Sequence, residues 1–418
     1  MTEKYGLIGR KLGHSYSQLI HHAFGQYSYF MQELEPEEVP DFIRHGDFRG
    51  LNVTIPYKKV ALECCDVVTS EARRIGSVNT VVRGTDGLLH GHNTDYAGFS
   101  YMAERAGIRW PGAKVLVLGT GGASLTVHAV LADQGVRCAV AVSRQGPVDY
   151  SNVAQLHGDA EIVVNTTPVG MFPDNGGCPV DLALFPRLTG VLDLIYNPMR
   201  TRLVQSALER GLATGDGLLM LVEQGRVAAG HFLGKELPRE LTPRTVARIR
   251  RDTANIALVG MPGCGKTAIG TLLAKALRRE LVDTDQLIVE DAGCSIAEIF
   301  AREGEGAFRA REEAAVAAAA KRSGVVIATG GGAVLREENR RNLRGNSYVV
   351  WLKRELAQVE LNVGRPLSTD LDAVRGMYGI REPLYRGVAD CIVENDRLPE
   401  QASAQIISWL MKDAKEPQ

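Results

Sequence analysis

The sequence predicts an α/β protein in which parallel sheets are covered by helices and divided among more than one domain. Short apolar runs alternate with amphipathic stretches along the whole chain, among them "KVLVLG", "EIVVNTT", "NIALVG" and "SYVVWL". This alternation is typical of strands that alternate with helices. A chain of 418 residues is also too long for one ordinary hydrophobic core. Each half contains a glycine-rich loop of a different design.

The composition excludes several classes of protein. The formal net charge of −1 gives no general attraction to nucleic acids or anionic membranes. No apolar run approaches the roughly 20 residues that span a bilayer, and the first residues lack the apolar core and small-residue cleavage site of a signal peptide. Seven cysteines without a CxxC pair favour a reducing compartment. We therefore expect a cytoplasmic protein that acts on small molecules and has no nucleic-acid or membrane partner.

The main domain boundary is expected near residues 238–254. The basic segment "RTVARIRRDTA" has no strand pattern and separates "HFLGKELPRELTP" from the apolar run "NIALVG". We interpret residues 238–253 as a solvated helix or linker. A nucleic-acid-binding arm is the alternative, although the segment is too short for a helix-turn-helix.

The stretch "GAKVLVLGTGGASLTVHAV" has the pattern strand, glycine turn, helix. Gly119, Gly121 and Gly122 would let the backbone approach a pyrophosphate, which the helix N-terminus stabilises. The next strand ends at Ser143 and Arg144. An acidic residue there would accept the ribose hydroxyls of NAD, whereas a cation suits the 2′-phosphate of NADP. The pattern predicts a Rossmann-like domain that binds NADP(H), with a solvated surface arginine as the alternative for Arg144.

Four polar clusters precede this domain, in "GHSYSQ", "LNVTIPYKK", "GSVNTVV" and "GHNTDYAGF". Small polar side chains at the ends of apolar segments can converge on a polyhydroxylated ligand. Taken alone, Lys58 is interpreted as a solvated loop lysine, and Asp95 as a turn residue or a helix cap. Beside a dinucleotide domain, the two suggest a pair that transfers a proton during hydride transfer.

With "GTGGAS", "NTTPVGM" and "DGLLMLVEQG", these motifs resemble the shikimate dehydrogenase family over about the first 235 residues. That family reduces 3-dehydroshikimate to shikimate with NADPH. The resemblance implies a catalytic lobe over residues 1–98, to which residues 217–237 return, and a Rossmann-like NADP lobe over residues 99–216. An NAD-using quinate/shikimate dehydrogenase is the alternative.

The resemblance also implies site residues. Lys58 would be the acid/base residue, paired with Asp95. The side chains expected to hold the carboxylate and hydroxyls of the substrate are Ser15, Ser17, Thr54, Asn79, Tyr196 and Gln224. The residues expected to line the cofactor site are Gly119, Thr120, Gly121, Gly122, Ala123, Ser143, Arg144, Leu194 and Gly217. Leu125 stands where the family usually has an arginine, and no second cation follows Arg144.

The second loop, "GMPGCGKT", fits the phosphate-loop pattern GxxxxGK[ST]. It follows the apolar strand "NIALVG" and precedes the helix former "AIGTLLAKAL". Lys266 would reach the β- and γ-phosphates, and Thr267 would offer its hydroxyl to Mg²⁺. The residues expected to bind ATP are Gly263, Cys264, Gly265, Lys266, Thr267 and Ala268.

Further motifs indicate the phosphate acceptor. In "LVDTDQLI", Asp283 and Asp285 lie on one face at a strand end, where one can support Mg²⁺ and the other meet a hydroxyl. Arg309 and Arg381 suit a carboxylate or a phosphate, with surface ion pairs as the alternative for each. Glycines 330–332 leave room for a ligand against the backbone.

Together with "GRPL" and "REPLY", these motifs resemble the shikimate kinase family over about residues 254–412. The family has a P-loop fold with a parallel sheet, like nucleoside monophosphate kinases, and transfers the γ-phosphoryl group of ATP to the 3-hydroxyl of shikimate. The resemblance implies that Asp285 positions this hydroxyl. It also implies a set of residues that bind the acid or the transferring phosphate: Arg309, Gly331, Arg381 and, from a lid, Arg365.

The sequence therefore predicts a bifunctional shikimate dehydrogenase–shikimate kinase that uses NADP(H), ATP and Mg²⁺ and serves chorismate and aromatic amino acid biosynthesis. A catalytically silent metabolite sensor is the alternative. Such a sensor would tolerate the loss of Lys58, Lys266 or Asp285, yet all three are present. A homodimer is compatible with the sequence.

Overall fold

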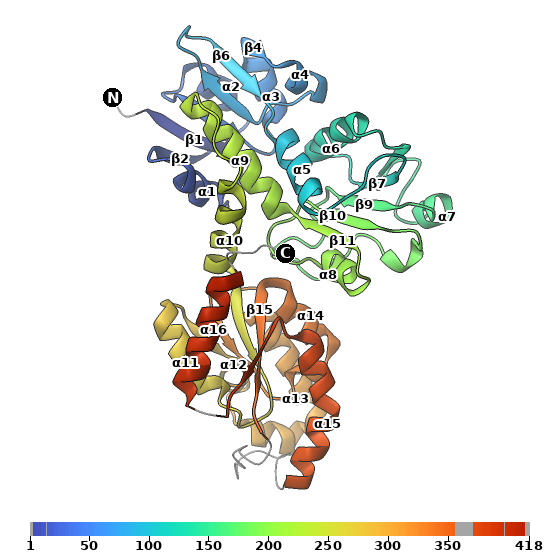
Figure 1. Ribbon diagram of the computed structural model, residues 1–418, viewed down its shortest axis with the longest axis vertical. Coiled ribbons are helices and arrows are strands. Elements are labelled where there is room, and N and C mark those ends of the chain that lie inside the picture. Colours follow the sequence, from blue (N-terminus) through green and yellow to red (C-terminus); the bar gives the residue numbers. More distant parts are fainter. Residues whose placement is uncertain (1–2, 14, 356–370, 397, 414–418) are drawn as a thin grey trace. The chain divides into compact units, whose positions relative to one another are not determined.

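The computed structural model describes residues 3–13, 15–355, 371–396 and 398–413 (Figure 1). The chain forms two compact units. Unit 1 comprises residues 1–171, 176–196 and 206–249, and unit 2 comprises residues 172–175, 197–205 and 250–418. Strands and helices alternate in both, which confirms the α/β class. None of the helices in the described ranges is long and apolar enough to cross a membrane.

The first sheet of unit 1 has six strands in the order β2-β1-β3-β5-β6-β4. They are β1 (Lys4–Gly9), β2 (Ser28–Glu33), β3 (Gly50–Val53), β4 (Val67–Val68), β5 (Thr80–Arg83) and β6 (Leu89–His92). Strand β5 is antiparallel to β3 and β6, so the prediction of parallel sheets is wrong here. A short turn with Gly87 at φ +83° joins β5 to β6, and so short a connection links only antiparallel neighbours.

Helices cover both faces of this sheet (Figure 1). Ile8 of β1 packs with residues of α2 (Val39–His45), α3 (Lys58–Cys64) and α4 (Ser70–Ile75). Its neighbour Leu7 faces the other side, toward Phe232 of α9 (Gly217–Leu233), and α1 (Ser17–Phe24) packs against α9. This alternation is the period of two expected of a strand buried on both faces.

The second sheet of unit 1 is entirely parallel, in the order β11-β10-β9-β7-β8. Its strands are β7 (Lys114–Leu118), β8 (Cys138–Val142), β9 (Ile162–Asn165), β10 (Gly190–Asp193) and β11 (Ala213–Asp216). One face packs against α5 (Asp95–Arg105), α6 (Gly122–Asp133) and α9. Further helical segments are α7 (Val153–His157), η1 (Leu182–Leu184) and α8 (Arg202–Glu209), of which α8 begins in residues that group with unit 2.

The segment expected to be a solvated helix or linker forms α10 (Leu241–Thr253), and one side of this helix is buried. Val246 and Ile249 pack with Ile20 of α1 and Val222 of α9. The arginines make the segment basic in composition, so its apolar residues, which lie at helical spacing along one side, are easily overlooked in the sequence. The part of this helix up to Ile249 therefore belongs to the core of unit 1.

Unit 2 contains one parallel sheet in the order β13-β14-β12-β15-β16. Its strands are β12 (Asn255–Val259), β13 (Leu281–Asp283), β14 (Val326–Ala328), β15 (Ser347–Lys353) and β16 (Cys391–Glu394). Its helices are α11 (Lys266–Leu277), α12 (Thr284–Ala292), α13 (Ile296–Ala320), η2 (Ala333–Leu335), α14 (Glu337–Asn346), α15 (Leu371–Val388) and α16 (Pro399–Asp413).

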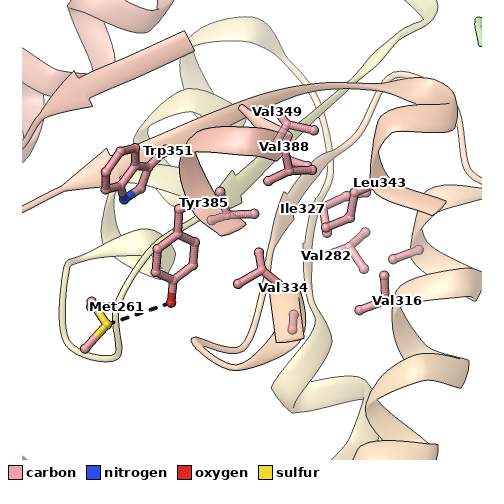
Figure 2. Close-up of a cluster of buried hydrophobic side chains, with 14 of the residues drawn as sticks. Met261, Val282, Val316, Ile327, Val334, Leu343, Val349, Trp351, Tyr385 and Val388 are labelled. Atoms are coloured by element: carbon pink, nitrogen blue, oxygen red, sulfur yellow. Dashed lines mark hydrogen bonds between the residues drawn. The ribbon is translucent and has the colours of Figure 1, made fainter. Parts of the chain in front are cut away.

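The two faces of this sheet have separate cores. Ile256 and Leu258 of β12 pack toward α11 and α16. Ala257 and Val259 pack toward α13, α14 and α15, where Trp351 is fully buried. Figure 2 shows this second core, with the Tyr385 hydroxyl directed at the sulfur of Met261. The sheet is thus sandwiched between two layers of helices, as the sequence predicts.

Residues 197–205 follow β10 in the chain, yet their contacts group them with unit 2. The Arg200 backbone N–H donates to the carbonyl of Gly345 at 2.8 Å, and Arg202 Nη2 donates to Asn342 Oδ1 at 2.7 Å. Gln205, almost wholly buried, donates from Nε2 to the Arg341 carbonyl. The sequence alone assigns this segment to the lobe 99–216.

Candidate active sites

Lys58 and Asp95, the expected acid/base pair, are in direct contact in unit 1. Lys58 Nζ lies 2.5 Å from Asp95 Oδ2, and their side chains are 19% and 11% exposed. Each residue opens a helix: Lys58 begins α3, and Asp95 begins α5. The partial positive charge of a helix N-terminus stabilises the Asp95 carboxylate, which in turn holds the ammonium group in place.

Several of the expected substrate-binding side chains also come together. Ser15 Oγ donates to Ser17 Oγ at 3.0 Å. Asn79 Oδ1 accepts from the Thr94 N–H at 2.8 Å, and Thr94 Oγ1 donates to Gln224 Oε1 at 3.3 Å. Because Thr94 directly precedes Asp95, the Asn79 and Gln224 amides lie beside the start of α5.

Two expected substrate ligands stand apart from these hydrogen bonds. Thr54 follows β3 and is half-buried; its backbone N–H donates to the Ile8 carbonyl at 3.0 Å. The Tyr196 ring lies 5.2 Å from the Tyr16 ring, and burial raises the pKa of Tyr196, with a smaller contribution from Tyr16. The structure gives neither side chain a hydrogen bond to Lys58 or Asp95.

The glycine turn after β7 has the geometry of a phosphate-binding loop. Gly119 has φ +103°, and a Cβ there would lie 2.8 Å from Thr166 Oγ1. At Gly121 and Gly122 an added Cβ would meet nothing within 4 Å. Gly119 is thus required for the turn itself, whereas the next two glycines leave open backbone at the start of α6.

The other expected cofactor residues surround the ends of β8 and β10. Ser143 follows β8, and its N–H donates to the Val148 carbonyl at 3.1 Å, while Arg144 is exposed. Gly217 begins α9, and a Cβ there would overlap the carbonyl of Leu194. Close approach of the two backbones therefore requires glycine at position 217.

In unit 2 the loop between β12 and α11 has three glycines at positive φ: Gly260, Gly263 and Gly265. Lys266 is 8% exposed, and its Nζ donates to the carbonyls of Gly260 and Met261, each at 2.9 Å. The ammonium group is therefore enclosed by the loop, in the position from which it can meet the oxygens of a bound phosphate.

Thr267 and Asp283 form an oxygen-rich pair beside this loop. Thr267 Oγ1 donates to Asp283 Oδ2 at 2.9 Å, while Asp283 Oδ1 accepts from the Asp285 N–H at 3.0 Å and so caps α12. The described residues contain no group of three or more His, Cys, Asp or Glu side chains that could enclose a metal ion. One hydroxyl and one carboxylate are nevertheless typical of Mg²⁺ that a substrate phosphate also ligates.

The three glycines at positions 330–332 have no side chains, so the side chains of catalytic candidates approach the backbone closely there. A Cβ at Gly330 would lie 2.7 Å from Asp285 Oδ1 and 2.9 Å from Glu312 Oε1. At Gly331 it would lie 2.6 Å from Pro262, and at Gly332 it would overlap the Arg309 guanidinium. The absence of side chains at these three positions therefore lets Asp285, Glu312, Pro262 and Arg309 approach the backbone.

Arg309 and Arg381 approach this loop from α13 and α15. Arg309 pairs with Glu312 at 2.8 Å and with Glu305 at 3.0 Å. Burial raises the pKa of Glu312, and the charge of Arg309 opposes the rise. Arg381 Nη1 donates to the Gly331 carbonyl at 3.3 Å. The Tyr385 hydroxyl donates to the same carbonyl at 2.5 Å (its position is shown in Figure 2).

Comparison with known proteins identifies both units. The family described as "Shikimate dehydrogenase substrate binding domain" matches residues 7–81, and the family "Shikimate kinase" matches residues 262–411. An NADP⁺ shikimate dehydrogenase of Clostridium perfringens strain SM101 is 36% identical over 242 residues, which cover 53% of this chain and 89% of that protein. The chain belongs to the shikimate dehydrogenase family. Its C-terminal part carries a shikimate kinase domain, so both enzyme classes are present.

Solved structures agree with this assignment. A chorismate mutase/shikimate 5-dehydrogenase fusion protein of Clostridium acetobutylicum is 31% identical with a TM-score of 0.56, over 60% of this chain and 97% of that one. A shikimate 5-dehydrogenase of Thermus thermophilus, in complex with NADP(H) and shikimate, is 31% identical with a TM-score of 0.52, over 59% of this chain and 99% of that one. The fold predicted for the dehydrogenase part is thereby confirmed.

Several residues that contribute to these sites were not found from the sequence. In the kinase unit these are Glu312, three residues after Arg309, and Tyr385, four residues after Arg381. In the dehydrogenase unit Thr94 connects Asn79 to Gln224. For Glu312 and Tyr385, the signal available in the sequence was their spacing of three or four residues from an arginine on the same helix. Arg365 lies outside the described residues.

The dehydrogenase unit is expected to lose stability in acid through His92. Its ring stacks on His231 at 3.9 Å, and burial, then the charge of His231, lowers the pKa of His92 to about 4. The unfolded chain binds this proton first, so stability falls as the pH drops from about 6.5 to 4, by about 2 kcal/mol after allowance for partial exposure.

Urea unfolding of the wild type and of His92→Gln at pH 4.5 to 7.5 measures this difference. His22→Gln, which changes an exposed histidine of the same unit, is the control. Identical pH dependence in wild type and His92→Gln would refute the prediction.

Gly331→Ala is expected to lower kcat/KM for phosphorylation about 100-fold while leaving the reduction reaction intact. The added Cβ would collide with Pro262 and displace the loop that is expected to hold the substrate, and a misplacement of about 1 Å costs rates of this order. The control is Gly306→Ala in α13, where a Cβ meets nothing within 4 Å. Steady-state assays of reduction and phosphorylation on each variant test this prediction. Equal phosphorylation rates in Gly331→Ala and Gly306→Ala would contradict it.

Proposed function

We propose that unit 1 reduces 3-dehydroshikimate to shikimate through the Lys58–Asp95 pair. When bound, NADPH supplies the hydride that the carbonyl carbon accepts. Lys58 Nζ donates a proton to the carbonyl oxygen and takes it back in the reverse reaction, and Asp95, 2.5 Å away, holds the ammonium group in place. Ser15, Ser17, Asn79 and Gln224 bind the carboxylate and hydroxyls of the substrate; Thr54 and Tyr196 complete this set.

For the cofactor, the open backbone at Gly121 and Gly122 fits a pyrophosphate at the start of α6. Gly119, Thr120 and Ala123 belong to the same turn, and Ser143, Leu194 and Gly217 line its surroundings. Exposed Arg144 is free to meet a 2′-phosphate, which supports NADP(H) over NAD(H). The ratio of kcat/KM for NADPH to that for NADH tests this preference, and a ratio below one would favour the NAD-using alternative.

We further propose that unit 2 transfers the γ-phosphoryl group of ATP to the 3-hydroxyl of shikimate. Gly263, Cys264, Gly265 and Ala268 present backbone N–H groups to the phosphates, and Lys266 neutralises their charge. Thr267 and Asp283 hold Mg²⁺, which stabilises charge on the phosphate oxygens when bound. Asp285 orients the acceptor hydroxyl, and Arg309, Arg381 and Gly331 bind the acid.

The observation that carries this proposal is that one chain contains both the Lys58–Asp95 contact and the Thr267–Asp283 pair beside a phosphate loop. Incubation of the full chain with 3-dehydroshikimate, NADPH and Mg-ATP, followed by mass spectrometry, tests it. Shikimate 3-phosphate that requires both nucleotides is expected. No turnover in either half would favour the metabolite sensor.

The proposed partners are therefore the small molecules 3-dehydroshikimate and shikimate. A cytoplasmic location, a homodimer and the lack of nucleic-acid or membrane partners remain predictions from the sequence. Size-exclusion chromatography with light scattering measures the oligomeric state.

A further inference from the structure

A row of buried polar side chains crosses the six-stranded sheet of the dehydrogenase unit. Tyr29 Oη donates to Asn52 Oδ1 at 2.9 Å, and Asn52 Nδ2 donates to Thr80 Oγ1 at 3.1 Å. Thr80 Oγ1 in turn donates to Asn79 Oδ1 at 3.1 Å. All four residues are at most 5% exposed, so water does not satisfy these groups. The row starts on β2 and ends at a proposed substrate ligand.

The row continues to a second proposed ligand on α9. Asn79 Nδ2 donates to Thr94 Oγ1 at 3.1 Å, and Thr94 Oγ1 donates to Gln224 Oε1 at 3.3 Å. Gln224 Nε2 donates to the backbone carbonyl of Leu221 at 2.8 Å. Side chains from three strands, from the loops before β5 and α5, and from α9 are thus connected in series, from Tyr29 to Gln224.

Two backbone groups fix the direction of this series. The Leu221 carbonyl can only accept, so the amide nitrogen of Gln224 faces it and the Gln224 oxygen faces Thr94. The Thr94 N–H can only donate, so the oxygen of Asn79 faces it, at 2.8 Å. The orientation of a side-chain amide is normally inferred from its hydrogen bonds. Here the Leu221 carbonyl and the Thr94 N–H each allow only one orientation of the amide that they contact, and the two orientations are compatible.

We propose that Tyr29, Asn52 and Thr80 are positioning residues that hold Asn79 in the orientation that the Thr94 N–H also requires, so that an N–H group of Asn79, like one of Gln224, faces the substrate. Asn79 Oδ1 already accepts from Thr94 and Thr80, and among the described residues each of the two amides uses only one of its N–H groups in a hydrogen bond. The site therefore presents donors at both positions and selects a ligand with oxygen acceptors there. This inference rests on the proposed roles of Asn79 and Gln224 in substrate binding.

The same series approaches the proposed carboxylate ligands. The Ser17 side chain hydrogen-bonds to the Tyr29 hydroxyl, an interaction that opposes the rise that burial causes in the pKa of Tyr29. Ser17 in turn accepts from Ser15 Oγ at 3.0 Å. The Tyr29 hydroxyl therefore donates to Asn52 and lies beside Ser17, one of the proposed carboxylate ligands.

Tyr29→Phe tests the proposal because it removes one oxygen and keeps the ring that stacks on His21 at 4.1 Å. We expect KM for 3-dehydroshikimate to rise about tenfold, equivalent to ~1.4 kcal/mol, with kcat within about twofold. KM for NADPH should not change. Tyr27→Phe is the matched control, because the Tyr27 hydroxyl lies 2.6 Å from His21 Nδ1 and makes no hydrogen bond in the series.

A second pair of variants separates positioning from packing. Thr80→Val removes the central hydroxyl at nearly constant volume and should raise KM in the same way, whereas Thr80→Ser should recover most of the loss. In an Asn79→Ala background, Tyr29→Phe should change KM by much less than in the wild type, because its effect passes through Asn79.

The outcomes are distinct. A lower Tm with an unchanged KM in Tyr29→Phe, in an active protein, would overturn this inference alone and leave the series a purely structural one. An equal effect of Tyr29→Phe with and without Asn79 would also overturn it. A wild-type chain that does not reduce 3-dehydroshikimate would overturn the proposed function, and this inference with it.

Discussion

Lys58→Ala is expected to lower kcat for the reduction of 3-dehydroshikimate about 10³-fold, within the range typical for the loss of a general acid. The reason is that Lys58, whose Nζ lies 2.5 Å from Asp95 Oδ2, is the cation of this pair. Without it, the pair has no group that can protonate the ketone oxygen. The rate is measured as the loss of NADPH absorbance under saturating substrate.

Lys59→Ala provides the matched control, because Lys59 is the adjacent lysine on α3 and is exposed. It should reduce the ketone at close to the wild-type rate. Phosphorylation of added shikimate, measured on the same preparation of Lys58→Ala, should also be retained. A Lys58→Ala enzyme with more than a tenth of the wild-type reduction rate would exclude the role assigned to this residue.

Lys266→Ala should reduce phosphorylation of shikimate about 10³-fold, since it removes the cation that faces the transferring phosphate. The side chain is 8% exposed and donates to two carbonyls of its own loop, so its charge is held where we propose that the phosphates bind. Alanine is a good helix former, so α11 should still begin at this position. ADP release in the presence of shikimate and Mg²⁺ measures the rate.

Lys275→Ala changes an exposed lysine of the same helix and should leave phosphorylation unchanged. Reduction of 3-dehydroshikimate should persist in both variants. If Lys266→Ala phosphorylates shikimate within tenfold of the wild type, the loop binds a ligand other than the phosphoryl donor.

Both nucleotide loops could be predicted from the sequence because each depends on local rules. A strand, a glycine that takes a positive φ and a helix start follow one another within about a dozen residues. Gly119 at φ +103° and Gly265 at φ +86° have the conformations that these loops demand. The Lys58–Asp95 contact is not local, and it was reached through the resemblance to a family.

The antiparallel part of the first sheet was missed, although its signal was present. The turn "GTDG" between β5 and β6 contains an Asp-Gly pair, which is typical of a hairpin. The apolar runs on either side were interpreted only as alternating strands and helices. The buried face of α10 was missed for a different reason, because charged residues on one side of a helix mask apolar residues at a spacing of three and four.

Contacts between segments that are distant in the chain could not be predicted from the sequence. Glu312 on α13 and Asp285 at the start of α12 meet at Gly330, and no local pattern brings these three residues together. Likewise, no motif connects Tyr29 with Asn52 or Thr80, since their hydrogen bonds depend on the order of the strands in the sheet, where β1 lies between β2 and β3. Only the order β2-β1-β3-β5 explains that series.

The grouping of residues 197–205 with unit 2 bears on how such a fusion can evolve. A gene cut after residue 249 would yield a fragment in which Arg202, 6% exposed, and Gln205, 1% exposed, lose the partners that bury them. Each would then expose polar groups adapted to an interior. We therefore expect that a recombination event that replaces the kinase part of the sequence must also change residues 197–205, which lie within the dehydrogenase part.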